Sequence, residues 1–192
     1  MFISNAGHQI IKDKILHLLN PNAWLCDQII NICLEGIVSP DVNLKDTFFF
    51  VELISENERL SAPKWNTIFE SSKTMAIPVN IDCHWLLMVV RNHDSILEIE
   101  CWDSLPTHQR IEKMRMLMVN SYNRFASVKK QLFFSVKSDC YIQQDRNNCG
   151  VFLISNIISL IQKIKPCNIC PEEARLAIAL MIFRSIRPSL NK

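Results

Sequence analysis

The chain is 192 residues long, 48% hydrophobic and 21% charged, with a formal net charge of +2. This length and apolar content are enough to bury one sizeable core, so we expect residues 1–192 to form a single domain without extended disorder. The small net charge, with no clustered basic stripe, argues against nucleic acid as a partner.

The N-terminal part is predicted to be helical. Apolar residues recur at helical spacing over His8–Leu19 and again over Ala23–Ile37. The aromatic run Phe48–Val51 fits a strand or a core loop, and a short helix is expected over Trp65–Ser71, after Pro63.

The centre of the chain is predicted to form a sheet, because apolar runs with strand-like spacing follow one another between polar turn residues. A run of strands flanked by helices implies an α+β fold, with a central, mostly antiparallel sheet packed against helices. The predicted strands are Met75–Asn80, Trp85–Arg91, Ile96–Trp102 and Leu132–Val136, and the predicted helices are Thr107–Phe125, Gly150–Ile164 and Pro171–Arg184.

The segment Gln143–Gly150 stands directly before an apolar run that begins at Val151. Cys149 would therefore lie in the first turn of a buried helix. The unpaired amide N–H groups and the positive end of the helix dipole stabilise a thiolate at such a position. Cys149 is thus the candidate nucleophile.

A nucleophile of this kind needs a base and a group that orients the base. His84 opens one predicted strand and Asp103 closes the next, and the polar interval Arg91–Ser95 between these strands is typical of a tight turn. In an antiparallel pair the start of the first strand lies beside the end of the second. The spacing therefore predicts a His84–Asp103 pair.

Four segments, read in order, resemble the SUMO-protease and adenoviral-protease group of cysteine peptidases, clan CE. The resemblance covers about residues 22–160 and implies the papain-like or adenain-like cysteine protease fold, with an N-terminal and a C-terminal helix packed on this core. The segments that carry it are Trp24–Asp27, His84–Trp85, Trp102–Leu105 and Gln143–Gly150.

The same resemblance implies catalytic roles. His84, Asp103 and Cys149 would form the triad, and a glutamine amide would hold the oxyanion of the tetrahedral intermediate. The offset from the cysteine favours Gln143 for the oxyanion. The adjacent Gln144 is the alternative, and otherwise a residue that contacts the substrate.

In this family two tryptophans cover a narrow channel for a C-terminal Gly-Gly, and Trp24 and Trp85 match their positions. Only glycine fits a flat slot between indoles, so such a channel selects Gly-Gly by excluding side chains. Asp27 resembles a position that meets the modifier's tail, where a carboxylate could pair with an arginine. The resemblance thus implies a cysteine isopeptidase without a cofactor, acting on conjugates of ubiquitin first and of SUMO or NEDD8 next.

Two other functions stay open at the level of the sequence. A YopJ-type acyltransferase resembles this fold, but it commonly has glutamate as the third triad member, where this chain has Asp103. A catalytically silent module that only binds a ubiquitin-like protein would need a distorted site, since a competent residue occupies every catalytic position. One position departs from the family pattern: Asn148, directly before the candidate nucleophile, stands where an acidic residue is usual.

The eight cysteines are not expected to form a disulfide set. Cys33, Cys83 and Cys101 lie in apolar patterns, where free thiols behave as small hydrophobic residues. A thiol nucleophile and the lack of a signal peptide favour a reducing, cytoplasmic setting, and the compact chain would also suit a bacterial effector secreted into a host cytosol. Cys167 and Cys170 form a lone CxxC, which does not predict a metal site.

The longest apolar stretch, Val151–Ile161, is shorter than the roughly 20 residues that cross a bilayer. No membrane partner is expected, and we expect the chain to be a monomer.

Overall fold

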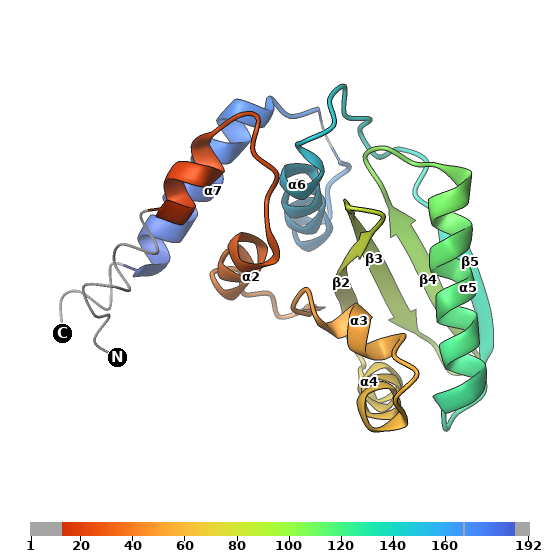
Figure 1. Ribbon diagram of the computed structural model, residues 1–192. Coiled ribbons are helices and arrows are strands. Elements are labelled where there is room, and N and C mark those ends of the chain that lie inside the picture. Colours follow the sequence, from red (N-terminus) through yellow and green to blue (C-terminus); the bar gives the residue numbers. More distant parts are fainter. Residues whose placement is uncertain (1–12, 167, 187–192) are drawn as a thin grey trace.

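The computed structural model describes residues 13–166 and 168–186. Its centre is a five-stranded sheet with the strand order β1-β2-β3-β4-β5, and helices lie on both sides of it (Figure 1). The expected α+β architecture is confirmed. The strands are β1 (Val42–Leu44), β2 (Thr74–Ile81), β3 (His84–Asn92), β4 (Ile96–Trp102) and β5 (Gln131–Val136).

The strand directions give the sheet an antiparallel centre and two parallel edges. β3 pairs antiparallel with both β2 and β4, whereas β1 joins β2 and β5 joins β4 in parallel. A parallel neighbour needs a crossover connection, and helix α5 (His108–Phe125) supplies it between β4 and β5. The predicted antiparallel pairing is therefore confirmed for the central strands that carry His84 and Asp103.

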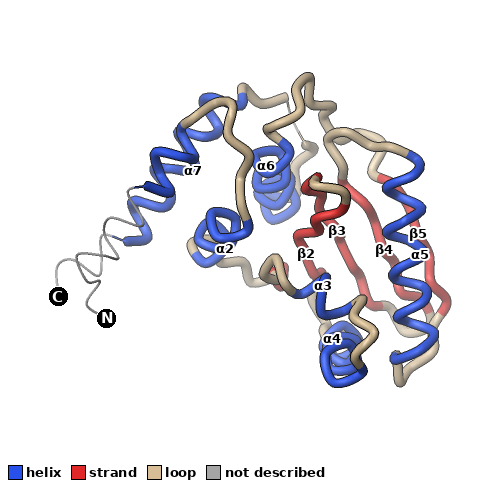
Figure 2. The backbone as a smooth tube through the Cα atoms, viewed as in Figure 1, coloured by secondary structure: helices blue, strands red, loops and turns tan. Residues whose placement is uncertain are grey.

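Helices cover both faces of the sheet (Figure 2). Besides α5 and a helical segment over residues 13–19, they are α2 (Asp27–Glu35), α3 (Phe49–Leu53), α4 (Glu58–Glu70), α6 (Cys149–Gln162) and α7 (Pro171–Ile186). Successive side chains of β3 face opposite layers. Leu87 and Val89 pack with α2, α6 and α7, whereas Leu86 and Met88 pack with α3, α4 and α5. Burial on both faces explains why β3 is a continuous apolar run.

Helix α5 illustrates where local signals were sufficient. It begins directly after Thr107, whose hydroxyl accepts the N–H of Arg110 as an N-cap. The predicted bounds of β2 to β5, α6 and α7 agree with the structure to within two residues. Of the first predicted helix, residues 8–12 lie outside the described residues, and residues 13–19 are helical.

The second predicted helix begins later than expected. α2 starts at Asp27 and not at Ala23, so Trp24 lies in the segment that leads into the helix. The carbonyls of residues 23, 24 and 25 accept hydrogen bonds from side chains of other elements. The carbonyl of Cys26 accepts the N–H of Ile30, which begins the helical pattern. Tertiary hydrogen bonds therefore keep residues 23–25 out of the helix.

The prediction of a strand or loop over Phe48–Val51 was wrong, because α3 occupies this run. Oδ1 of Asp46 accepts the backbone N–H groups of Phe48 and Phe49 and turns the chain into a short helix. The aromatic composition suggested a strand, but the preference of aromatic residues for strands depends on context.

The helix expected after Pro63 starts earlier, since α4 contains Pro63 within it. Proline at this position forfeits one backbone hydrogen bond. Asn57 caps the helix with its side chain, and the indole of Trp65 bonds the hydroxyl of Ser121 in α5 at 2.9 Å. Strand β1 was not predicted, because a run of three residues is too short to show a period.

A two-residue turn joins β2 to β3 directly before His84. Ile81 pairs with His84, so Asp82 and Cys83 form the turn, with φ angles of 53° and 57°. A left-handed conformation at both positions is typical of a type I′ hairpin, which favours Asn-Gly because a Cβ is strained there. The sequence pattern predicted that Cys83 lies in an apolar strand. This was wrong, because Cys83 is exposed in the turn.

Replacing Cys83 by glycine should stabilise the fold, because glycine adopts positive φ without strain. We expect the free energy of unfolding to rise by about 0.5–1 kcal/mol. The melting temperature should then rise by about 1–4 °C, measured by circular dichroism. Cys83→Ser keeps the Cβ, so this control should have the same melting temperature as the wild type. A Cys83→Gly variant that melts at or below the wild-type temperature would contradict strain in the turn.

Candidate active site

The residues predicted as a triad come from three elements that meet at one end of the sheet. His84 is the first residue of β3, Asp103 follows the last residue of β4, and Cys149 is the first residue of α6. All three are buried, with exposures of 5%, 1% and 1%.

The strand register brings the imidazole of His84 onto the carboxylate of Asp103. Nε2 of His84 lies 2.6 Å from Oδ1 of Asp103. The same carboxylate accepts the N–H of Leu105 at 2.8 Å and the guanidinium of Arg110 at 3.3 Å. Burial opposes the charged carboxylate, but these hydrogen bonds and the charges of His84 and Arg110 prevail and lower the pKa of Asp103. Asp103 is therefore ionised and held in one orientation.

Because Nε2 of His84 is engaged with Asp103, the other ring nitrogen is left for Cys149. Cys149 lies close enough to the ring to contribute to the pKa of His84. Burial favours the neutral ring, yet the hydrogen bonds to Asp103 and Cys149, together with their charges, raise the pKa of His84 to about 9. The site thus stabilises an imidazolium beside a sulfur at the positive end of α6.

Gln143 is held in place by the residue that follows Asp103. It is 2% exposed, its Oε1 accepts the hydroxyl of Ser104 at 2.7 Å, and its backbone N–H donates to the Ser104 carbonyl at 2.8 Å. These bonds fix the side-chain amide, whose nitrogen donates to the carbonyl of Asp145 at 2.9 Å. Gln144, in contrast, is exposed. Of the two glutamines, Gln143 is the one anchored beside the triad.

Asp145 shapes the loop before α6. Its Oδ1 accepts the backbone N–H groups of Asn147 and Asn148 at 3.0 and 2.9 Å, and its Oδ2 accepts the side-chain amide of Asn148 at 3.0 Å. The other amide atom of Asn148, Oδ1, accepts the guanidinium of Arg175 at 2.9 Å. Asn148 is therefore an uncharged link directly before Cys149.

Trp24 and Trp85 are related through one backbone segment. The indole N–H of Trp85 donates to the carbonyl of Leu25 at 2.9 Å, and Trp85 is 7% exposed. Trp24, the neighbour of Leu25, is 49% exposed. Asp27 is half-buried at the start of α2. The structure presents Trp24 as an open indole, and Trp85 supports the segment that carries it.

Four groups of the site were not expected from the sequence: Ser104, Arg110, Asp145 and Arg175. Each contacts a residue that the sequence did indicate, either Asp103, Gln143 or Asn148. Ser104 lies within the segment that had already been recognised. Nothing in the sequence marks Arg110, because its role depends on how α5 packs against the end of β4.

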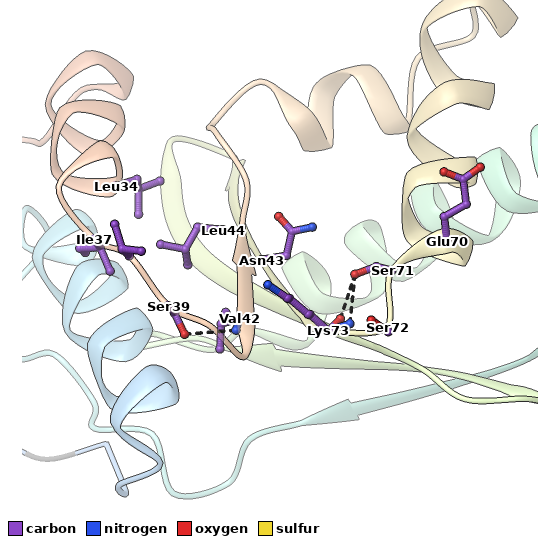
Figure 3. A pocket seen from close by; sticks show the side chains of 11 residues that line it. Leu34, Ile37, Ser39, Val42, Asn43, Leu44, Glu70, Ser71, Ser72 and Lys73 are labelled. Atoms are coloured by element: carbon purple, nitrogen blue, oxygen red, sulfur yellow. Dashed lines mark hydrogen bonds between the residues drawn. The ribbon is translucent and has the colours of Figure 1, made fainter.

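A large hollow lies away from these groups, at the other end of β2 (Figure 3). Its volume is about 550 Å³, and it is lined by the end of α2, by β1 and by residues 70–73. Thr74 stands next to it, whereas Ile81 pairs with His84. These seven steps along β2 correspond to roughly 20 Å, so the hollow is separate from the candidate active site.

Within residues 13–166 and 168–186, no helix is long and apolar enough to cross a membrane, and no group of His, Cys, Asp or Glu side chains is placed to hold a metal ion. Cys33 and Cys101 are buried free thiols, and burial raises the pKa of each to about 12. Of the CxxC pair, Cys167 lies outside the described residues, and Cys170 is exposed.

Comparison with known protein families assigns the chain to one of them. The Ulp1 protease family, C-terminal catalytic domain, matches residues 23–174. The chain belongs to this family. The match confirms the resemblance drawn from the four sequence segments, and it spans all the residues from Trp24 to Cys149 described above.

Relatives within the family are distant and longer. Ubiquitin-like-specific protease 2 of Saccharomyces cerevisiae is 28% identical over 199 residues, covering 81% of this chain and 19% of that protein. The chain spans no more than about half the length of the curated relatives it matches.

Solved structures share the fold of this Ulp1-family chain. The effector XopD of Xanthomonas campestris, bound to ubiquitin, has a TM-score of 0.66 at 17% identity, covering 85% of this chain and 91% of that chain. The C-terminal Ulp1 protease domain in complex with Smt3, the yeast ortholog of SUMO, has a TM-score of 0.61 at 15% identity, covering 95% and 96%. The expected cysteine protease fold is thereby confirmed.

His84 should keep its proton to an unusually high pH. Since folding raises its pKa from 6.5 to about 9, the stability it contributes is complete below pH 6.5 and is lost as the pH rises through about 9. An NMR titration of the imidazole in the folded chain measures this midpoint. Asp103→Asn removes a charge that favours imidazolium, so the midpoint should fall.

The control for this titration is Asp41→Asn, which removes an exposed carboxylate bonded to Lys163. It should leave the His84 midpoint unchanged. Equal midpoints in the wild type and in Asp103→Asn would contradict the electrostatic role of Asp103.

Proposed function

We propose that this chain is a cysteine isopeptidase that cleaves after the C-terminal Gly-Gly of a ubiquitin-like modifier joined to a target lysine. The observation that carries the proposal is the buried His84–Asp103 hydrogen bond, which turns the imidazole toward Cys149 at the start of α6. Membership in the Ulp1 protease family supports it.

In the proposed reaction, the sulfur of Cys149 attacks the carbonyl carbon of the last glycine. The negative charge that forms on the carbonyl oxygen is held by the amide of Gln143 and by a backbone N–H at the start of α6. His84 gives its proton to the departing lysine amine, which leaves a thioester on Cys149. Water, deprotonated by His84, then hydrolyses the thioester and frees the modifier. Asp103 keeps the ring oriented through both steps.

The proposed substrate follows from the residues around the nucleophile. Trp24 would lie over the Gly-Gly backbone, with Trp85 beneath the segment that presents it. Asp27 suits a modifier tail that carries arginine, which makes ubiquitin our first candidate and SUMO or NEDD8 the next. The proteins of similar fold were solved with ubiquitin in one case and with Smt3 in the other.

Modifier probes test this proposal directly. Ubiquitin, SUMO, NEDD8 and the interferon-induced modifier, each ending in a thiol-reactive group, are incubated with the chain, and adducts are located by mass spectrometry. We expect an adduct at Cys149, formed fastest with ubiquitin and absent in Cys149→Ala.

Cys83→Ser is the matched control for this assay, because it removes an exposed thiol outside the site. It should react as the wild type does, whereas Trp24→Ala should react more slowly. If none of the four probes labels Cys149 in the folded wild type, the proposed function is wrong.

The oxyanion role of Gln143 predicts a separate kinetic effect. Gln143→Ala should lower kcat on a fluorogenic Gly-Gly substrate by about 10²–10³-fold, the typical effect of removing one oxyanion donor. Ser104→Ala leaves the amide present but frees its oxygen, so kcat should fall less, with KM little changed. Gln144→Ala should have the smallest effect. A larger loss in Gln144→Ala than in Gln143→Ala would reverse the assignment.

A further inference from the structure

Arg175 of α7 is a buried charged group that the reaction does not use. The residue is 1% exposed. Its guanidinium donates to Oδ1 of Asn148 at 2.9 Å and to two backbone carbonyls, that of Leu18 at 2.7 Å and that of Ala23 at 2.6 Å. All three acceptors are uncharged.

A buried guanidinium without a carboxylate in contact is costly to hold, because three neutral acceptors only partly replace the water that it loses. Burial accordingly lowers the pKa of Arg175, against the opposing charges of Asp145 and Glu172. An apolar side chain at this position of α7 would fill space without that cost. The presence of arginine therefore indicates a role that needs several hydrogen bonds donated in different directions by one side chain.

The three bonds of Arg175 join two parts of the active site that are far apart in sequence. Asn148 is the residue directly before Cys149. Leu18 and Ala23 lie at the two ends of the turn that connects residues 13–19 to Trp24, and α7 runs beside this segment (Figure 1). One planar group thus contacts the start of the nucleophile helix and the segment that presents the open indole.

Two further hydrogen bonds hold the segment before α2 in place. The amide of Asn147 donates to the carbonyl of Pro21 at 2.6 Å, and His17 bonds the carbonyl of Trp24 at 2.9 Å. The side chain of Leu25 packs against Gly150, so apolar contact also joins the two segments. Among the three side chains that make these hydrogen bonds, Arg175 is the one that bonds both Asn148, next to Cys149, and Ala23, next to Trp24.

We propose that Arg175 is a positioning residue: through Asn148 it fixes the first turn of α6 around the Cys149 sulfur, and through Ala23 it fixes Trp24 relative to that sulfur. This inference rests on the proposed role of Cys149 as the nucleophile. Arg175 itself touches neither the sulfur nor the substrate in this role. Its loss should therefore disturb both the reactivity of the thiol and the placement of the Gly-Gly tail.

The reactivity of Cys149 can be measured without any modifier. The chain is treated with iodoacetamide between pH 4 and 9, and alkylation is quantified in the tryptic peptide 147–163, which contains Cys149 as its only cysteine. The charged groups around this thiol are His84 with Asp103 behind it, Asp145 in the preceding loop, and Arg175. The pH profile of alkylation reports on how these groups are held.

In the wild type we expect Cys149 to be alkylated faster than the exposed Cys83 near neutral pH, because the thiolate is the reactive form. Arg175→Met, which has a similar side-chain volume but no guanidinium, should slow the alkylation of Cys149 at that pH by roughly 10-fold. Asn148→Ala removes the bond to Arg175, together with the bond from the Asn148 amide to Asp145, and leaves the bonds of Arg175 to Leu18 and Ala23 in place. It should slow alkylation in the same way. Arg175→Lys keeps the positive charge, but an ammonium group cannot reach all three acceptors as the guanidinium does. This variant should therefore show the wild-type profile only in part.

On the fluorogenic Gly-Gly substrate, Arg175→Met should lower kcat/KM by about 10²-fold, as expected for a displaced catalytic group, with changes in both kcat and KM. Arg115→Met is the matched control, because it removes the same charge from an exposed site on α5. It should change neither the alkylation profile nor kcat/KM.

The outcomes separate the two proposals. A fast alkylation of Cys149 in the wild type that is unchanged in folded Arg175→Met and in Asn148→Ala would overturn the role of Arg175 alone, even if the melting temperature falls. If Cys149 in the folded wild type is alkylated no faster than the exposed Cys83, its role as the nucleophile is contradicted, and with it this inference. If Arg175→Met does not fold, the alkylation profile of Asn148→Ala decides.

Discussion

The short hydrogen bond between His84 and Asp103 is the interaction on which the rest of the site depends. It exists because β3 and β4 pair antiparallel with Leu87 opposite Trp102, so that His84 at the start of β3 lies near Asp103, just beyond the end of β4. The bond commits one ring nitrogen, and this leaves the opposite nitrogen for Cys149. Burial of the pair then makes its charges effective, since few water molecules are present to screen them.

The sequence predicted this core well because each signal was local or followed from one strand pairing. The strand bounds and the starts of α5 and α6 depend on neighbours in the chain. Two elements show where such local prediction fails. The side chain of Asp46 turns an aromatic run into the short helix α3, although its composition suggested a strand. Tertiary contacts of α4 hold a helix that contains Pro63, although proline usually ends one. Arg110 and Arg175 could not be found in this way, since each acts on residues brought near only by helix packing.

The segment before α2 shows how tertiary hydrogen bonds replace regular structure around Trp24. Residues 23, 24 and 25 have helical periodicity in the sequence, yet each gives its carbonyl to a side chain of another element. The backbone is thereby satisfied without a helix. Trp24 is left on a firmly held stretch with its ring open, an arrangement that an ordinary helical turn would not provide.

The place of Arg175 in the chain has a consequence for synthesis. It follows Asn148 by 27 residues, and it lies in the last described helix. A nascent polypeptide that has emerged only as far as Gln162 contains every member of the proposed triad but lacks the guanidinium that ties the two segments together. If Arg175 positions Cys149 as proposed, the thiol would reach its full reactivity only after α7 has been synthesised and has packed against these two segments.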